Sequence, residues 1–142
     1  MNISQLLGLA LKDDQIVDLL EHYGVDVIYD FDRLRENTPD RYSASFHDGG
    51  FEFIFSDAQL LRTIFLYASS RGKFKPIRPD YAGVPLYQSF REAKGAFERA
   101  GIPIQVSKSD EGYVKGSFGD RTVHYEFRAE ALVLVTISLA NA

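Results

Sequence analysis

Two stretches of the sequence, 51–70 and 123–142, share one order of features: an alternating aromatic strand, a short polar turn and a second apolar strand. Phe51, Phe53 and Phe55 share one face of the first strand, and Tyr125 and Phe127 share the equivalent face 72 positions later. Alternation with period two is typical of antiparallel strands that are buried on one side. Because strands of this kind must pair, the two hairpins favour a single antiparallel sheet.

A helical pattern precedes each hairpin. Residues 6–26 align with residues 81–103 at a shift of 75 to 77 positions, and each segment has apolar residues at helical spacing. Few aligned residues are identical, so the alternative is a chance similarity of two α+β halves. We interpret the pattern as an internal duplication. The predicted apolar stripes are Ile16, Leu20 and Tyr23 in the first helix and Phe90, Ala93, Phe97 and Ala100 in the second.

Both predicted helices have recognisable ends. Asp13 is placed to cap the first helix, and Ser89 with Glu92 fits a capping box at the start of the second. Gly24 and Gly101 follow the last apolar positions, where a residue with positive φ commonly ends a helix. These signals predict helices over residues 13–24 and 89–101.

Together these features predict an α+β fold made of two tandem αβββ repeats in one domain, 1–142, whose antiparallel sheet is covered on one face by helices. The first repeat is residues 1–70 and the second is residues 81–142. Between them, residues 71–80 form a linker that two prolines make too ordered for a flexible tether. The linker bases are Arg71, Lys73, Lys75 and Arg78.

Composition limits the function classes. Hydrophobic residues make up 45% and charged residues 25%, which is typical of a globular protein rather than a disordered one. The absence of cysteine excludes disulfides, a thiolate nucleophile and a thiolate metal site. The first residues do not resemble a signal peptide, and no apolar run is long enough for a membrane helix. We therefore expect a cytoplasmic protein that does not bind membranes.

No catalytic motif is apparent. His22, His47 and His124 show no metal-ligand spacing, so structural or solvated histidines are the favoured interpretation. Asp30 and Asp32 are a candidate carboxylate pair for acid–base chemistry, but two arginines follow in the same polar loop and favour solvation or ion pairing. We expect no enzyme activity, no cofactor and no metal. The alternative is a small-ligand-binding protein or an enzyme of unknown chemistry.

Charge is unevenly distributed along the chain. Residues 1–60 hold twelve acids and four bases, a net charge of −8, whereas the remaining residues hold eight acids and twelve bases, a net charge of +4. An acidic half can attract a basic partner, although two solvated faces of a stable domain would give the same pattern. The basic linker with Phe74 and Tyr81 is a candidate for contacts with nucleic acid. The overall charge of −4 and the lack of an RNA-binding motif disfavour that function.

The segment 27–42 combines aromatic and acidic residues in alternation. Tyr29 and Phe31 alternate with Asp30 and Asp32, which suits a site for a basic protein partner, because aromatic anchors hold a partner and charges speed the encounter. The alternative is an ordinary strand whose two rings lie in the core. We predict that all four residues bind a partner protein.

The first predicted helix supplies a second group of acids. Asp14, Asp18 and Glu21 are spaced by four and three residues, so they share one helix face opposite the apolar stripe. We predict that they belong to the same partner-binding surface.

Three segments resemble immunity-like proteins of bacterial polymorphic toxin loci: "LLGLALKDDQIVDLLEHYG", "FEFIFSDAQLLRTIFLYA" and "YAGVPLYQSFREAKGAFERAGIP". The resemblance implies an α+β protein that binds and blocks a cognate toxin domain, which would commonly be basic. The tandem layout also looks like that of the β-lactamase inhibitory protein. That family is secreted and disulfide-bonded, and this chain lacks both features. No binding residue is carried over from either family.

Overall fold

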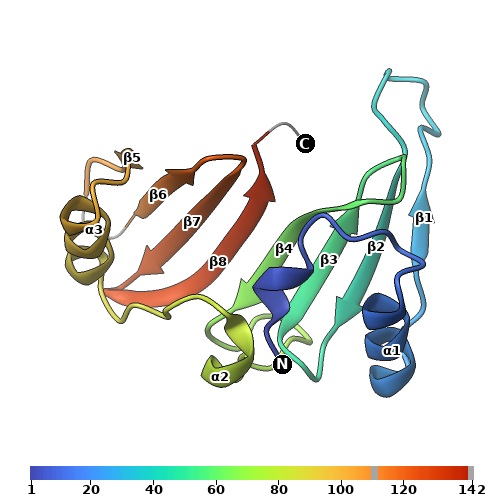
Figure 1. The fold of residues 1–142 in the computed structure, drawn as a ribbon, viewed down its shortest axis with the longest axis horizontal. Helices are drawn as coiled ribbons and strands as arrows, with labels where there is room; N and C mark the ends of the chain where they lie inside the picture. The colour runs from blue at the N-terminus through green and yellow to red at the C-terminus, as the bar shows by residue number, and fades with distance from the viewer. Residues whose placement is uncertain (110–111, 141–142) are drawn as a thin grey trace.

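The computed structural model describes residues 1–109 and 112–140. Within that part of the chain, the strands form one antiparallel sheet with the order β1-β2-β3-β4-β8-β7-β6-β5 (Figure 1). The first half contains a 3₁₀ helix η1 (Ile3–Leu6), α1 (Asp14–Tyr23), β1 (Ile28–Asp30), β2 (Arg41–Phe46), β3 (Phe51–Phe55) and β4 (Leu61–Tyr67). The second half contains α2 (Pro79–Ala82), α3 (Phe90–Arg99), β5 (Ile104–Val106), β6 (Tyr113–Phe118), β7 (Arg121–Arg128) and β8 (Ala131–Leu139).

The two halves meet along one pair of strands, β4 and β8. In each half, a ten-residue helix precedes four strands that pair in chain order, where the sequence predicted three. The additional strands, β1 and β5, have only three residues each, which is too short to show period-two alternation. Positions 141 and 142, which the prediction placed in the second hairpin, lie outside the described residues.

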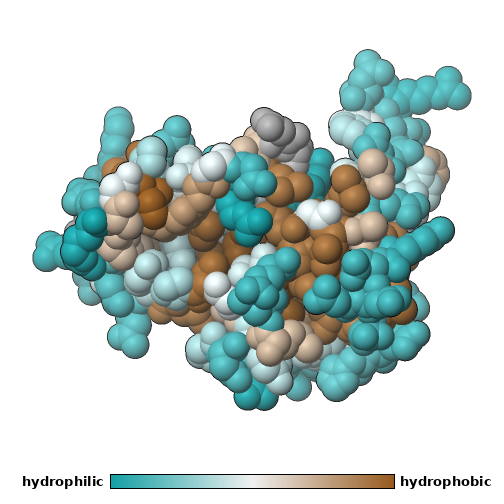
Figure 2. Space-filling model, in the orientation of Figure 1, coloured by the Kyte–Doolittle hydropathy of each residue, from teal (hydrophilic) through white to brown (hydrophobic). Residues whose placement is uncertain are grey.

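Aromatic side chains from the helices pack on the sheet. Tyr23 of α1 meets Phe46 and Phe51 edge-on, with ring centroids 5.6 and 5.7 Å apart. In the second half, Phe97 of α3 lies 5.8 Å from the Tyr125 ring and close to the backbone of Gly116. Figure 2 shows hydrophobic residues gathered in the middle of the molecule, where β4 and β8 lie in Figure 1, inside a mostly hydrophilic periphery.

The predicted helix starts are confirmed. The Asp13 carboxylate accepts a hydrogen bond of 2.9 Å from the amide of Gln15, and the Ser89 hydroxyl accepts one of 3.1 Å from the amide of Glu92. Gly24 has a φ of 62° and ends α1. Ala100, which the sequence placed on the apolar stripe of α3, is exposed instead, because α3 ends one residue earlier.

The opposite side of each central strand presents polar and half-buried side chains. Strand register places Glu52 of β3 beside Ser45 and Phe65, and the Glu52 carboxylate accepts hydrogen bonds from the hydroxyls of Ser45 (2.7 Å) and Tyr67 (3.2 Å). On the second half, the same row continues through Thr136, His124 and Lys115. A sheet face rich in hydroxyl groups is typical of antiparallel sheets exposed on one side.

The segment that connects the two halves packs against the sheet. The Phe74 ring stacks on Tyr67 with centroids 4.0 Å apart, and the amide of Ile77 donates to the Tyr67 carbonyl at 2.8 Å. The amide of Lys75 donates to the His47 carbonyl at 2.9 Å. The predicted linker 71–80 therefore holds the β2–β3 turn in place, and α2 begins within it at Pro79.

Two buried tyrosine side chains, those of Tyr67 and Tyr125, make the stability of the fold depend on pH in alkaline solution. Burial and the neighbouring Glu52 carboxylate raise the pKa of Tyr67 to about 12. Burial also raises the pKa of Tyr125, whose hydroxyl donates a 2.9 Å hydrogen bond to the Pro85 carbonyl. An unfolded tyrosine ionises near its ordinary pKa of about 10, so the unfolded chain loses these protons first.

We therefore expect the contribution of Tyr67 to stability to be complete below about pH 10 and to be lost as the pH rises towards 12. The Tyr67→Phe variant should lose stability less steeply with pH than the parent chain does. Urea unfolding midpoints at several pH values between neutral and alkaline solution measure the two slopes. Equal slopes for the two proteins would contradict this linkage.

Candidate functional site

Exposed apolar side chains gather on β1 and the loop that follows it. Ile28 is 59% exposed, Tyr29 46%, Phe31 51% and Leu34 77%, and we call these four residues the edge patch. They make up most of the large apolar side chains that are exposed in the described part of the chain. Figure 1 shows this loop projecting beyond the ends of the neighbouring strands. Tyr29 and Phe31 lie together, with ring centroids 5.9 Å apart, and Ile28 lies on the other face of β1. Exposed apolar side chains concentrated in one segment commonly mark an interaction site.

Asp40 holds the base of the projecting loop. Its carboxylate accepts hydrogen bonds from the Tyr29 hydroxyl at 2.5 Å and from the Asp32 amide at 3.2 Å. The hydrogen bond with Asp40 raises the pKa of Tyr29 to about 12. The Tyr29 ring also stacks on Tyr42 of β2, with centroids 4.9 Å apart. These contacts position the edge patch without burying it.

The structure separates the roles of the four residues predicted in this segment. Tyr29 and Phe31 are exposed, so the alternative that both rings lie in the core is wrong. Asp30 pairs with Arg41 across the strand at 3.5 Å. Asp32 is half-buried and accepts the amide of Glu36 at 2.9 Å, so its carboxylate shapes the turn. The two carboxylates thus have separate structural partners, which disfavours the carboxylate-pair chemistry considered from the sequence.

The three acids of α1 lie on its exposed face. Asp14, Asp18 and Glu21 are exposed, while Ile16 and Leu19 on the other side of the helix are buried. No ion pair or side-chain hydrogen bond joins any of the three acids to another residue of the described chain. Their charge is therefore directed towards solvent and acts on whatever approaches α1.

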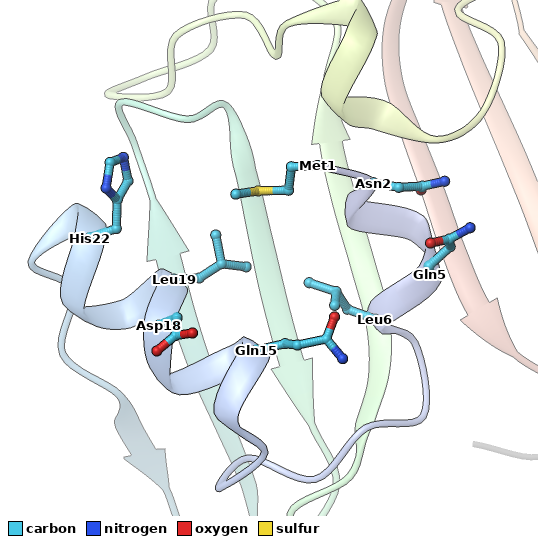
Figure 3. A pocket seen from close by; sticks show the side chains of 8 residues that line it. All are labelled: Met1, Asn2, Gln5, Leu6, Gln15, Asp18, Leu19 and His22. Carbon is cyan, nitrogen blue, oxygen red and sulfur yellow. The ribbon is translucent and has the colours of Figure 1, made fainter.

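A cavity of about 470 Å³ lies between η1 and α1 (Figure 3). Leu6 and Leu19 provide apolar walls, and Asp18 and His22 lie on α1 one helical turn apart. The remaining lining residues are Met1, Asn2, Gln5 and Gln15. One carboxylate and one imidazole without a mutual hydrogen bond in the described structure do not form an acid–base pair. The cavity is a candidate for binding a small ligand.

Sequence reasoning missed two members of the edge patch, Ile28 and Leu34. A signal was present for Leu34, because it is the one apolar residue in the charged run from Asp32 to Glu36. Two charged residues flank it on each side, and such residues are mostly exposed, so the context favours exposure of Leu34 as well. Ile28 gave no such signal, because an isoleucine before an alternating segment is usually read as a buried strand residue.

No group of three or more potential metal ligands lies together in residues 1–109 and 112–140. Over the same residues, every helix is too short or too polar to span a bilayer. Comparisons of the chain with models of protein families, with curated proteins and with solved structures found no match.

Proposed function

We propose that this chain is a non-enzymatic binding protein that acts as an immunity protein: it binds a cognate bacterial toxin domain and blocks it. The observation that carries the proposal is the edge patch, four exposed apolar side chains set among carboxylates on β1 and the loop that follows it. Aromatic anchors supply binding energy and surrounding charge supplies steering, so this combination suits a protein partner of basic charge.

We also infer that the two halves are copies of one unit. Each half runs from a ten-residue helix into four consecutively paired strands, and the sheet order is symmetric about the β4–β8 pair. The helical aromatic residues pack on one side of the sheet in both halves. On this basis the helices cover one face, and the connecting segment packs on Tyr67 at one side of the other, more polar face.

The acidic first half offers a physical route to inhibition. Toxin domains that act on polyanions such as nucleic acids need a basic substrate site. The carboxylates of α1 lie on the same half as the edge patch, and residues 1–60 have a net charge of −8. A partner held at the edge patch would therefore meet negative charge where its own substrate would otherwise bind.

The experiment that tests the function is growth protection. The chain is co-expressed with the toxin domain encoded by a neighbouring gene, and survival is compared with that of cells that express the toxin alone. Protection together with a co-purifying complex supports the proposal. Survival unchanged by the chain, with no complex, contradicts it.

The cavity between η1 and α1 favours a second candidate, a small-ligand-binding protein. Its apolar walls with a few polar groups resemble those of a small-molecule site. Leu19→Trp would fill this cavity from α1. If the protein functions by binding a small ligand in this cavity and not by binding a toxin, Leu19→Trp should abolish ligand binding. Phe31→Ala, in the edge patch, should leave ligand binding intact.

Neutralising the helix acids should mainly slow association. The variant Asp14→Asn/Asp18→Asn/Glu21→Gln keeps side-chain size and removes three charges that point to solvent. We expect the association rate constant for the basic toxin domain to fall about tenfold at low salt, with a weaker salt dependence and little change in dissociation. Stopped-flow binding at several salt concentrations measures this, and the matched control is Glu130→Gln, an exposed acid of the second half. Equal salt dependence in all three proteins would place the encounter surface elsewhere.

Removing an anchor ring should instead speed dissociation. Phe31→Ala deletes an exposed ring of the edge patch, and such truncations at an interface centre cost about 2 kcal/mol, or roughly thirtyfold in affinity. We expect the lost affinity to result from a higher dissociation rate constant, which surface plasmon resonance measures. Leu60→Ala, another exposed apolar residue outside the edge patch, is the control. A Phe31→Ala variant that dissociates at the parent rate would exclude Phe31 as an anchor.

A further inference from the structure

β1 is an end strand of the sheet. Among the described strands it pairs with β2 alone, with Ile28 opposite Ser43 and Asp30 opposite Arg41. Backbone groups along its other side therefore have no strand partner in the described sheet. A free edge of this kind is a template on which another extended segment can form hydrogen bonds.

The two edges of the sheet are not equivalent. β5 has the same length as β1, but α3 packs against it, Pro103 precedes it and Lys108 follows two residues after it. Helical cover, proline and lysine are common means of protecting an edge. β1 contains no proline or lysine and instead presents Ile28 and Tyr29 to solvent. The β1 edge is thus left open where the β5 edge is protected.

The side chains of β1 define what an added strand should carry. Ile28 and Asp30 lie on one face of the strand, and Tyr29, stacked on Tyr42, lies on the other. An antiparallel segment beside β1 would bury an apolar residue against Ile28 and would place a cation near Asp30. The matching sequence therefore carries an apolar residue and a basic residue two positions apart, on the same face of the added strand.

Charge decides between a second copy of this chain and a basic partner. Residues 13–41, which contain α1, β1 and the loop, hold nine acids and three bases, a net charge of −6. Pairing β1 with β1 of another copy would bring two such acidic surfaces together, which is electrostatically unfavourable. A basic segment would instead be attracted by the negative charge around β1.

From these observations we propose that the partner docks by adding an extended segment to the free edge of β1, and that this segment carries an apolar and a basic residue two positions apart. This inference rests on the proposed function and specifies how the partner binds. Backbone hydrogen bonds along β1 provide the affinity, and contacts with Ile28, Phe31 and Asp30 provide the specificity.

The test uses a synthetic peptide of about nine residues in which every second residue is threonine and the residues between are lysine and valine in turn, so that one face carries both types. We expect it to bind the full chain, to slow hydrogen exchange of the amides of residues 28–30, and to bind at least tenfold more weakly when glutamate replaces lysine. Successive N–H groups of a strand point to opposite edges, so only every second peptide N–H faces β1. Methylating those nitrogens should abolish binding, and methylating the other nitrogens should not. Equal effects of the two methylated sets, or no binding of the lysine peptide, would overturn the proposal.

Variants of the chain provide a matched comparison of the two edges. Ile28→Lys places a cation on the exposed side of β1, and Val106→Lys does the same on β5, where Val106 is also exposed. Peptide binding should fall at least tenfold in the first variant and stay unchanged in the second. Equal loss in both variants, each checked for folding by circular dichroism, would contradict docking at β1.

The same readouts separate this inference from the proposed function. If the chain protects cells from the toxin but exchange of residues 28–30 in the toxin complex is unchanged, docking at β1 is wrong and the immunity function stands. If the peptide binds at β1 but the chain neither protects cells nor binds the toxin, the docking mode stands and the immunity function is wrong.

Discussion

Replacing Gly50 with alanine is expected to lower the free energy of unfolding by about 3 kcal/mol or more, because backbone strain and steric overlap add together. Gly50 lies in the β2–β3 turn with a φ of 77°, a conformation that side-chain-bearing residues rarely adopt. A Cβ at this position would overlap the Lys75 carbonyl oxygen and would lie 2.5 Å from the amide nitrogen of Ile77. Both obstacles are backbone atoms, so no side-chain rotation relieves the contact.

The matched control is Gly72→Ala. Gly72 also has a positive φ, 57°, but no atom lies within 4 Å of the position that a Cβ would occupy. This variant should therefore lose only the conformational part, about 1 kcal/mol. Urea denaturation followed by circular dichroism gives both values. Equal destabilisation of the two variants would mean that the connecting segment yields freely to the added methyl group.

Phe46→Ala should destabilise the chain by about 3–5 kcal/mol, the usual result of removing a fully buried ring. Phe46 is completely buried, and its ring contacts Tyr23 of α1 and both Phe51 and Phe53 of β3. Its removal would leave a cavity between α1 and β3, and closely packed neighbouring rings fill such a space only in part.

The control for Phe46 is Phe31→Ala, which removes the same ring from a site that is half exposed. We expect this variant to change the free energy of unfolding by less than about 0.5 kcal/mol, as is usual for surface substitutions. Thermal and urea unfolding of the two variants measure the difference. A similar loss in both would show that the projecting loop is part of the stabilising core.

The central strands were predictable because burial repeats along them. Phe51, Phe53 and Phe55 are buried as the alternation predicted, and the equivalent residues Tyr125 and Phe127 are buried on β7. The turns were predictable from glycine and aspartate positions between the strands. These features are local in the sequence, so a period-two pattern and a turn signal were sufficient to find them.

The outer strands and the connecting segment were not predictable in the same way. β1 and β5 are strands only because they pair with longer neighbours, and pairing is a property of the fold and not of three residues. The connecting segment was expected to be an ordered linker, without a predicted contact to the sheet. It packs on Tyr67 through Phe74, a contact that depends on a ring from another strand.

The candidate site was partly accessible from the sequence. The helix acids Asp14, Asp18 and Glu21 share an exposed face as their spacing predicted. Exposure of Tyr29 and Phe31 was one of two alternatives, because alternation alone does not show whether a strand has a covering layer. Within residues 1–109 and 112–140, β1 ends the sheet with no strand beyond it, and only the strand order of the folded chain shows this.

The pairing of β4 with β8 has a consequence during synthesis. The first half of the chain leaves the ribosome with β4 complete at Tyr67, but the strand that covers its open side begins only at Ala131. Until then, the nascent first half presents a strand containing Ile64 and Leu66 whose backbone is unpaired along one edge. Truncated products that end between the halves should therefore be prone to self-association, and chaperones that bind unpaired strands should act before the second half emerges.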